Sequence, residues 1–427
     1  MQPQPHLLRR LTTFDAVVIG LGSMIGAGVF AAFGPAARAA GAMLLIGLAI
    51  AAGIAYCNAV ASAQLAAAYP SSGGTYHFGR ERLNDWWGFT AGWGFVIGKT
   101  ASCAAMAITV AVYAAPNGPW WFQRLIAVGA VVSLTALNYR GITRTAGLAR
   151  VLVTLTLLAL GTVVISIWIW GDTDASRLTS WDSGSGSGVY GVLQASGLLF
   201  FAFAGYARIA TLSEEVRDPT RTIPRAIPIA LGITVVVYAT IAVTILAASG
   251  ADRIAGATAP LVTAIETAGV GRMTFIVQLG GMIASTGALL ALIAGIGRTA
   301  LAMARNRDLP PWLAAVHPDY RVPHHAEIAL AVVVSIIVLL VDLRGAIGFS
   351  SFGVLIYYAI ANASAWTQES PQRMWPRALN VTGLIGCLVL VATLPLVSIL
   401  TGVAMFAIGL AGRLIVLRHR ASHPSPA

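Results

Sequence analysis

The sequence predicts an all-α integral membrane protein with twelve transmembrane helices. Only 10% of its 427 residues are charged and 57% are hydrophobic, whereas about a quarter of the residues in soluble domains carry a charge. Apolar runs of about 20 residues, the length that crosses a bilayer, recur from end to end of the chain. We place the spans at residues 14–34, 39–66, 87–115, 120–138, 149–170, 189–212, 225–249, 273–303, 326–342, 346–366, 377–395 and 397–417.

The arginines are distributed unevenly between the two sides of this arrangement. Eighteen of them fall on one side of the membrane and six on the other. Because basic loops stay in the cytoplasm, the bias predicts that both termini are cytoplasmic. The net charge of +11 then follows from topology, so we expect the lipid bilayer, and no nucleic acid, as a partner. The first span is too long for the apolar core of a signal peptide, and we expect it to be retained.

The first span contains four glycines within I-G-L-G-S-M-I-G-A-G-V-F, residues 19–30. Glycine costs a helix about 1 kcal/mol relative to alanine, and a backbone group freed at bilayer depth finds no water. Non-helical backbone is tolerated there where it packs in protein or lines a cavity, and a half-helix that begins there directs its N–H groups into that cavity. We therefore predict a break over residues 23–28, with a binding site beside it.

The second and third spans differ in character. Residues 39–66 are rich in alanine, which lets neighbouring helices approach closely and indicates a scaffold. The turn-rich stretch 69–76 is either a tight cytoplasmic loop or a gate. Lys99, the only lysine of the chain, lies well inside the third span. A lysine at that depth is costly and predicts a functional role; the alternative is that it snorkels or caps the carbonyl groups of a broken helix.

A stretch that ends in alternating serine and glycine separates two blocks of spans. Its composition predicts a flexible external connector over residues 172–188. It divides the chain into a first five-helix block (1–171), a second five-helix block (189–366), and two last helices with a cytoplasmic tail (367–427). The last two spans carry no charge or break at their centres, so we interpret them as a peripheral or dimerisation pair.

The sixth span places aromatic residues against Gly205 in mid-membrane, and Arg208 follows within one turn. If the two blocks are inverted copies, this span is the counterpart of the first. Paired interruptions at corresponding positions point to the substrate site of a transporter. Arg298 lies near the cytoplasmic end of the eighth span, where snorkelling accounts for it. Residues 259–268 predict a short external surface helix.

The sequence gives no sign of an enzyme. Cys57, Cys103 and Cys387 lie in separate spans without metal-ligand spacing, so we expect reduced core residues and no metal or other cofactor. The seven histidines lie in loops or tails, and no nucleophile, base and orienting group converge.

Several short motifs, taken together and in this order, resemble a bacterial permease of the amino acid–polyamine–organocation superfamily. They are I-G-A-G-V-F at 25–30, the turn at 70–76, F-F-A-F-A-G at 200–205, E-E-V-R-D-P at 214–219 and I-P-R at 223–225. The resemblance implies a five-plus-five inverted-repeat fold of the leucine-transporter type, with helices 1 and 6 broken and two C-terminal helices added. It also implies transport by alternating access.

The resemblance carries a substrate site over to this chain. It implies that the α-carboxylate of an amino acid is held by backbone N–H groups at Gly26, Ala27 and Gly28. The α-ammonium is held by carbonyl groups at both breaks, which here belong to Ile25, Phe201, Ala202 and Ala204, beside Gly205. Either Phe201 or Phe203 is then an aromatic gate over the ligand, the alternative being a simple core role.

The chain departs from such relatives where they carry charges. Many have a lysine in span five, where Thr156 stands here, and an acid and a tyrosine after the Gly-Trp of span three, where this chain has Gly98 and Lys99. We interpret Lys99 as a fixed sodium surrogate or as a proton carrier whose pKa burial lowers. Arg208 either selects an anionic substrate side chain or pairs with Glu215.

These observations predict a secondary active transporter of neutral or acidic amino acids in the cytoplasmic membrane. No aspartate or glutamate lies at the centre of a predicted span, which disfavours polyamines and other strongly cationic substrates. The alternatives are an exchanger or uniporter without ion coupling, and a membrane sensor subunit that does not transport. We expect a monomer or a homodimer.

Overall fold

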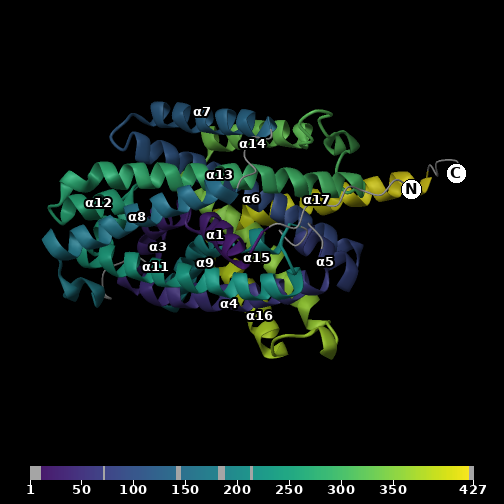
Figure 1. Ribbon diagram of the computed structural model, residues 1–427, viewed down its shortest axis with the longest axis horizontal. Coiled ribbons are helices and arrows are strands. Elements are labelled where there is room, and N and C mark those ends of the chain that lie inside the picture. Colours follow the sequence, from purple (N-terminus) through teal and green to yellow (C-terminus); the bar gives the residue numbers. More distant parts are fainter. Residues whose placement is uncertain (1–10, 71–72, 141–145, 181–187, 212–214, 423–427) are drawn as a thin grey trace.

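The computed structural model describes residues 11–70, 73–140, 146–180, 188–211 and 215–422 (Figure 1). Across these residues the regular structure is helical, with one isolated bridge between Leu11 and Val216. The α-helices are, in chain order, α1 (Thr13–Met24), α2 (Ala27–Ala31), α3 (Phe33–Ala40), α4 (Leu44–Ala68), α5 (Gly74–Arg82), α6 (Asp85–Ala114), α7 (Trp120–Tyr139), α8 (Ala146–Trp170), α9 (Val189–Phe203), α10 (Ala207–Ala210), α11 (Pro219–Gly256), α12 (Pro260–Thr267), α13 (Thr274–Arg305), α14 (His324–Leu340), α15 (Leu343–Trp366), α16 (Arg377–Thr393) and α17 (Leu396–Ser422).

The helices have the length and composition of membrane spans. Among the described residues, nine helical segments are long and apolar enough to cross a membrane, and α9, α14 and α16 are shorter apolar helices. Each of the twelve predicted spans coincides with one of these segments. The chain is therefore an all-helical, multi-pass membrane protein. Twelve crossings as the final number, and the inverted repeat, stay predictions.

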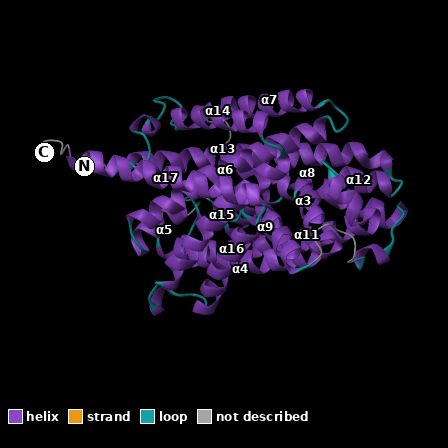
Figure 2. Cartoon of the chain, turned by 180° about the vertical axis from the view of Figure 1, so that it is seen from behind, coloured by secondary structure: helices purple, strands orange, loops and turns teal. Residues whose placement is uncertain are grey.

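Helix α6 lies at the centre of the bundle. It is buried along almost all of its length, and α15 packs against it, whereas α7 and α17 present most of their surface outward. Small residues permit the central contact: a Cβ at Gly98 of α6 would stand 3.2 Å from the Cα of Gly353 on α15. Helices α7 and α14 lie side by side along one edge of the molecule, with α4 and α16 at the opposite edge (Figures 1 and 2).

Two of the segments that connect the predicted spans contain short helices. The stretch at 69–76 leads into α5, which begins at Gly74 with a left-handed φ of 55°; residues 71–72 lie outside the described part. Residues 259–268, expected to form a short external surface helix, contain α12, which buries Leu261 and Ile265 and leaves Glu266 exposed. Its apolar face packs against α11 and α13. Of the connector at 172–188, residues 181–187 lie outside the described residues.

The three cysteines are free and buried, as predicted.

Candidate functional site

The first interruption lies between α1 and α2. Ile25 (φ −79°, ψ 67°) and Gly26 (φ −121°, ψ −138°) have non-helical backbone angles, and helix resumes at Ala27. A Cβ at Gly26 would stand 2.6 Å from the Cβ of Ala288 on α13, so the interruption packs tightly against that helix. Glycine relieves this crowding, since it brings no side chain.

The second interruption lies between α9 and α10, and it contacts the first. Helix α9 ends at Phe203, and Ala204 to Tyr206 form a turn before α10. A Cβ at Gly205 would stand 2.2 Å from the backbone oxygen of Ser23, and one at Gly28 would stand 2.5 Å from the Cα of Ala202. The two interrupted segments therefore meet backbone to backbone.

Two tyrosines from other helices hold the carbonyl groups at these interruptions. The Tyr238 hydroxyl of α11 lies 2.6 Å from the Met24 oxygen and 3.0 Å from the Ala202 oxygen. The Tyr358 hydroxyl of α15 donates to the Ala204 oxygen at 3.1 Å. Sequence analysis missed both residues. The available signal was a tyrosine deep in an apolar span, because membrane tyrosines ordinarily lie at the interface and a buried hydroxyl needs a partner.

Lys99 donates to the same turn. Its Nζ lies 2.9 Å from the Ala204 oxygen, and the residue is 5% exposed. The Ala204 oxygen thus accepts from Lys99 and from Tyr358, which uses both of its lone pairs. This contact is the carbonyl cap that the sequence left open as an alternative. Whether Lys99 also couples transport to an ion stays a prediction.

A cavity of about 40 Å³ lies beside the second interruption. This volume holds a few water molecules, since a single water needs about 10–15 Å³ on this measure. The cavity is bounded by the end of α1 at Ser23, by the second interruption with α10, and by α6 and α13. Its lining residues are Ser23, Phe95, Lys99, Ala204, Gly205, Ala207, Arg208, Thr211, Ala288, Ala291, Leu292, Gly295, Arg298 and Thr299.

Three cations face this cavity, namely Lys99, Arg208 and Arg298. Arg298 forms an ion pair with Glu215 at 3.3 Å, so the expectation that it merely snorkels is wrong. This pair also replaces the predicted pairing of Glu215 with Arg208. Arg208 donates to the Thr211 hydroxyl at 3.4 Å. None of the lining residues that the structure describes is acidic.

Thr156 lies at a second, separate cavity of about 70 Å³ between α1, α8 and α13. Ser23 and Ile25 line this cavity as well. The Thr156 hydroxyl donates to the Leu152 oxygen one turn earlier in its own helix, at 2.8 Å. It is therefore close to the first interruption but on the other side of it from Lys99.

The structure distributes the predicted substrate-binding residues over four environments. Ala204 and Gly205 line the central cavity, and Ile25 lines the second one. Phe203 is fully buried with its ring 5.0 Å from that of Tyr238, an environment of the core. The remaining predicted residues are buried, and Gly28 and Ala202 among them contact each other: Gly26, Ala27, Gly28, Phe201 and Ala202.

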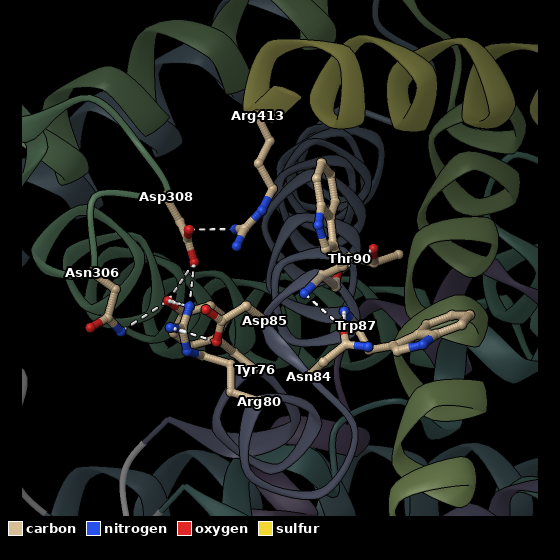
Figure 3. A network of polar contacts seen from close by, with 10 residues as sticks. Tyr76, Arg80, Asn84, Asp85, Trp87, Thr90, Asn306, Asp308 and Arg413 are labelled. Atoms are coloured by element: carbon tan, nitrogen blue, oxygen red, sulfur yellow. Dashed lines mark hydrogen bonds and ion pairs between the residues drawn. The ribbon is translucent and has the colours of Figure 1, made fainter. Parts of the chain in front are cut away.

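A network of polar side chains closes one end of the bundle, where α5, α6, α13 and α17 meet (Figure 3). Asp308, just after α13, is its centre. It accepts from the Tyr76 hydroxyl at 2.7 Å and from Arg80 at 3.0 Å, and Arg413 of α17 pairs with its second oxygen. Asn306 donates to the Tyr76 hydroxyl at 2.9 Å.

The network is largely buried. The side chains of Arg413 and Asp308 are 6% and 7% exposed, and the guanidinium of Arg413 lies 4.7 Å from the centre of the Phe89 ring. Burial, together with the hydrogen bond to Asp308, raises the pKa of Tyr76 to about 12. The Tyr76 hydroxyl therefore stays protonated at physiological pH and keeps donating. Arg413 brings α17 into this network, although the sequence placed that helix at the periphery.

Comparison with known proteins identifies relatives along the whole chain. Residues 11–414 match the family model described as amino acid permease. An uncharacterized transporter of Mycobacterium tuberculosis is 56% identical over 433 residues, which cover 98% of this chain and 97% of the relative.

Two more distant relatives have names that state a class of amino acid. The branched-chain amino acid permease BcaP of Bacillus subtilis is 25% identical, over 95% of this chain and 92% of its own length. Cationic amino acid transporter 4 of Homo sapiens is 27% identical, over 84% of this chain and 60% of its own length.

We predict that Gly205→Ala destabilises the protein by about 1–3 kcal/mol, because its new methyl group overlaps the backbone of Ser23. Gly129→Ala on α7 is the matched control, since a Cβ there meets nothing within 4 Å and alanine favours helix. Thermal unfolding of the purified protein in detergent measures both. An equal melting temperature for the two variants would contradict the close contact of the interruptions.

A second prediction concerns the network at Asp308. Asp308→Asn removes the charge that compensates Arg413, and breaking a buried pair costs about 3–5 kcal/mol. The control is Asp218→Asn, because Asp218 and Arg221 form an exposed pair with side chains 52% and 78% exposed, where we expect a change within about 0.5 kcal/mol. Unfolding by denaturant in detergent compares the two, and wild-type stability of Asp308→Asn would refute the prediction.

Proposed function

Because the chain belongs to the amino acid permease family, we propose that it is a secondary active transporter of neutral or acidic amino acids. Transport proceeds across the cytoplasmic membrane by alternating access, with both termini in the cytoplasm. The observation that carries the proposal is the contact between two interrupted helices beside a buried cavity. In many transporters the substrate binds where two membrane helices are interrupted at corresponding positions.

The two ends of an amino acid find complementary groups at the interruptions. For the carboxylate we propose the N–H groups of Gly26, Ala27 and Gly28, which lie where helix resumes, the end of a helix that favours an anion. The Gly26 N–H donates to the Met24 oxygen at 2.8 Å in this form, so a ligand must displace that bond. For the α-ammonium we propose carbonyl groups of Ile25, Phe201, Ala202 and Ala204. Phe201 remains the candidate gate, since the packing of Phe203 on Tyr238 supports a core role for that ring.

Lys99 has a specific part in this scheme. Its ammonium group already occupies the Ala204 oxygen, one of the positions proposed for the substrate ammonium. We propose that substrate displaces Lys99 from this oxygen. A displaced lysine with a neutral form available can then release a proton, which couples transport to the proton gradient. The second candidate is an exchanger without ion coupling. The same hydrogen bond favours it if Lys99 keeps its charge while it donates to the Ala204 oxygen.

The closed form of the molecule supports alternating access. The central cavity is too small for an amino acid, and the network around Asp308 holds α5, α13 and α17 together at one end. Substrate entry therefore requires these helices to move. We propose that residues 1–171 and 189–366 are the two repeats that move relative to each other, joined by the connector at 172–188, with α16 and α17 added to them.

We predict that one or more amino acids stabilise the purified protein against heat. A ligand that binds only the folded protein adds about 2.7 kcal/mol at a concentration of a hundred times its Kd. A thermal-shift screen against the twenty amino acids, followed by uptake of the labelled hits into proteoliposomes, tests the proposal. Binding without uptake would instead indicate a sensor subunit, and neither binding nor uptake would refute the proposal.

Lys99→Gln separates the two roles of Lys99. Glutamine can still donate to the Ala204 oxygen but cannot titrate near neutral pH, whereas Lys99→Met loses both properties. We predict that Lys99→Gln folds, and that its uptake no longer responds to an imposed pH gradient across the proteoliposome. Lys99→Met should in addition melt at a lower temperature. A Lys99→Gln variant with the rate and pH dependence of the wild type would show that Lys99 only caps the turn.

A further inference from the structure

We propose that Arg208 reads a carboxylate on the substrate side chain, so that the transporter prefers acidic amino acids over their neutral analogues. This inference rests on the proposed function and narrows its substrate class. It follows from the charges around the cavity, from the incomplete hydrogen bonding of Arg208, and from the spacing between Arg208 and Ala204.

The charges around the cavity do not balance. Lys99, Arg208 and Arg298 face it, and Glu215 is the one carboxylate that the described structure places in an ion pair with any of them. Among the described residues, Lys99 and the partly buried Arg208 have no carboxylate in ion-pair contact, so positive charge is in excess there, and a charge withdrawn from water without a partner is costly. A neutral amino acid is a zwitterion and leaves this excess unchanged. An acidic amino acid brings one further negative charge and reduces it.

Arg208 has hydrogen-bonding capacity left for a ligand. Its guanidinium group carries five N–H donors in a planar fork. Within the described residues its side chain donates to the Thr211 hydroxyl, at the long distance of 3.4 Å. The facing wall is a glycine: a Cβ at Gly295 would stand 3.9 Å from Nη1 of Arg208. Arg208 itself lines the cavity, and Gly295 places no side chain against its Nη1. A carboxylate is the group that the fork of an arginine binds best, with two parallel hydrogen bonds.

The position of Arg208 suits the far end of an acidic amino acid. It follows Ala204 by four residues, across the turn at Ala204 to Tyr206 and into α10, and both residues line the cavity. Ala204 is the proposed contact of the α-ammonium, and Lys99 marks where an ammonium group sits on its oxygen. Three or four single bonds of about 1.5 Å join an α-nitrogen to a side-chain carboxylate. Because Ala204 and Arg208 line the same cavity, we take one ligand to contact both.

The same charges oppose cationic substrates. A lysine or arginine side chain in this cavity would face Arg208 and Arg298, and like charges brought together in an interface are strongly unfavourable. Specificity of this kind comes from the unfavourable contact as much as from the favourable one. This chain should thus differ in substrate from the relatives whose names state cationic amino acids.

The wild-type protein provides the first test. Proteoliposomes containing it are supplied in parallel with labelled glutamate, glutamine, aspartate, asparagine and arginine. We expect the kcat/KM for each acid to exceed that for its amide by about 10- to 100-fold, the range that one charged hydrogen-bonding group contributes. Arginine should be the poorest substrate. Uptake of amides in preference to acids would overturn the inference and leave the proposed function intact.

Variants then assign the preference to Arg208. Arg208→Gln keeps a polar side chain of similar length and should bring the acid-to-amide ratio of kcat/KM close to one. Arg208→Lys keeps the charge without the fork and should give an intermediate ratio. Arg221→Gln, at an arginine whose side chain is 78% exposed, should keep the wild-type ratio. An unchanged ratio in Arg208→Gln would overturn the assignment.

Failure of the broader proposal has a different signature. If the wild-type protein takes up no amino acid and none shifts its melting temperature, the proposed function falls, and the role of Arg208 falls with it. The wild-type ratio needs no variant, so it stays informative even if Arg208→Gln does not fold.

Discussion

The interrupted helices depend on one physical constraint, which is that a carbonyl group at bilayer depth must find a donor inside the protein. Water is absent there, and each unsatisfied backbone group costs several kcal/mol. The donors come from three different helices: Lys99 from α6, Tyr238 from α11 and Tyr358 from α15. The interruptions are therefore stable only when these helices are assembled around them, and the site is a product of the whole bundle.

This arrangement makes the site easy to reorganise. Lys99 and Tyr358 share one acceptor, the Ala204 oxygen, so a ligand ammonium group that arrives there exchanges one donor for another. The number of hydrogen bonds at the carbonyl is conserved in that exchange, which keeps its cost low. The ammonium group of Lys99, once displaced from the carbonyl, must then move elsewhere or lose its proton. In the proposed transport cycle, ligand binding and the state of Lys99 would be linked through this single oxygen.

Local features of the site were predictable from the sequence, and long-range ones were not. Glycine acts on its own backbone, so the interruption near Gly26 could be predicted from neighbouring residues, and Lys99 was conspicuous because no other lysine occurs. The partners of Tyr238 and Arg298 depend on how distant helices pack. A pattern within one span carries no information about which carbonyl or carboxylate lies opposite, and so Arg298 was assigned to snorkelling although it pairs with Glu215.

The position of Arg413 shows the same limit and has a mechanical consequence. In the sequence, Arg413 only adds to the excess of arginines on one side of the membrane. In the structure it is buried against Asp308 and the Phe89 ring. The charges of a buried ion pair attract each other strongly because water is excluded from them. This attraction weakens once water reaches the pair. If α5, α13 and α17 part, water enters and the pairs at Asp308 lose most of their strength. In the proposed transport cycle, the network would therefore resist the first step of opening and offer little resistance to the steps that follow.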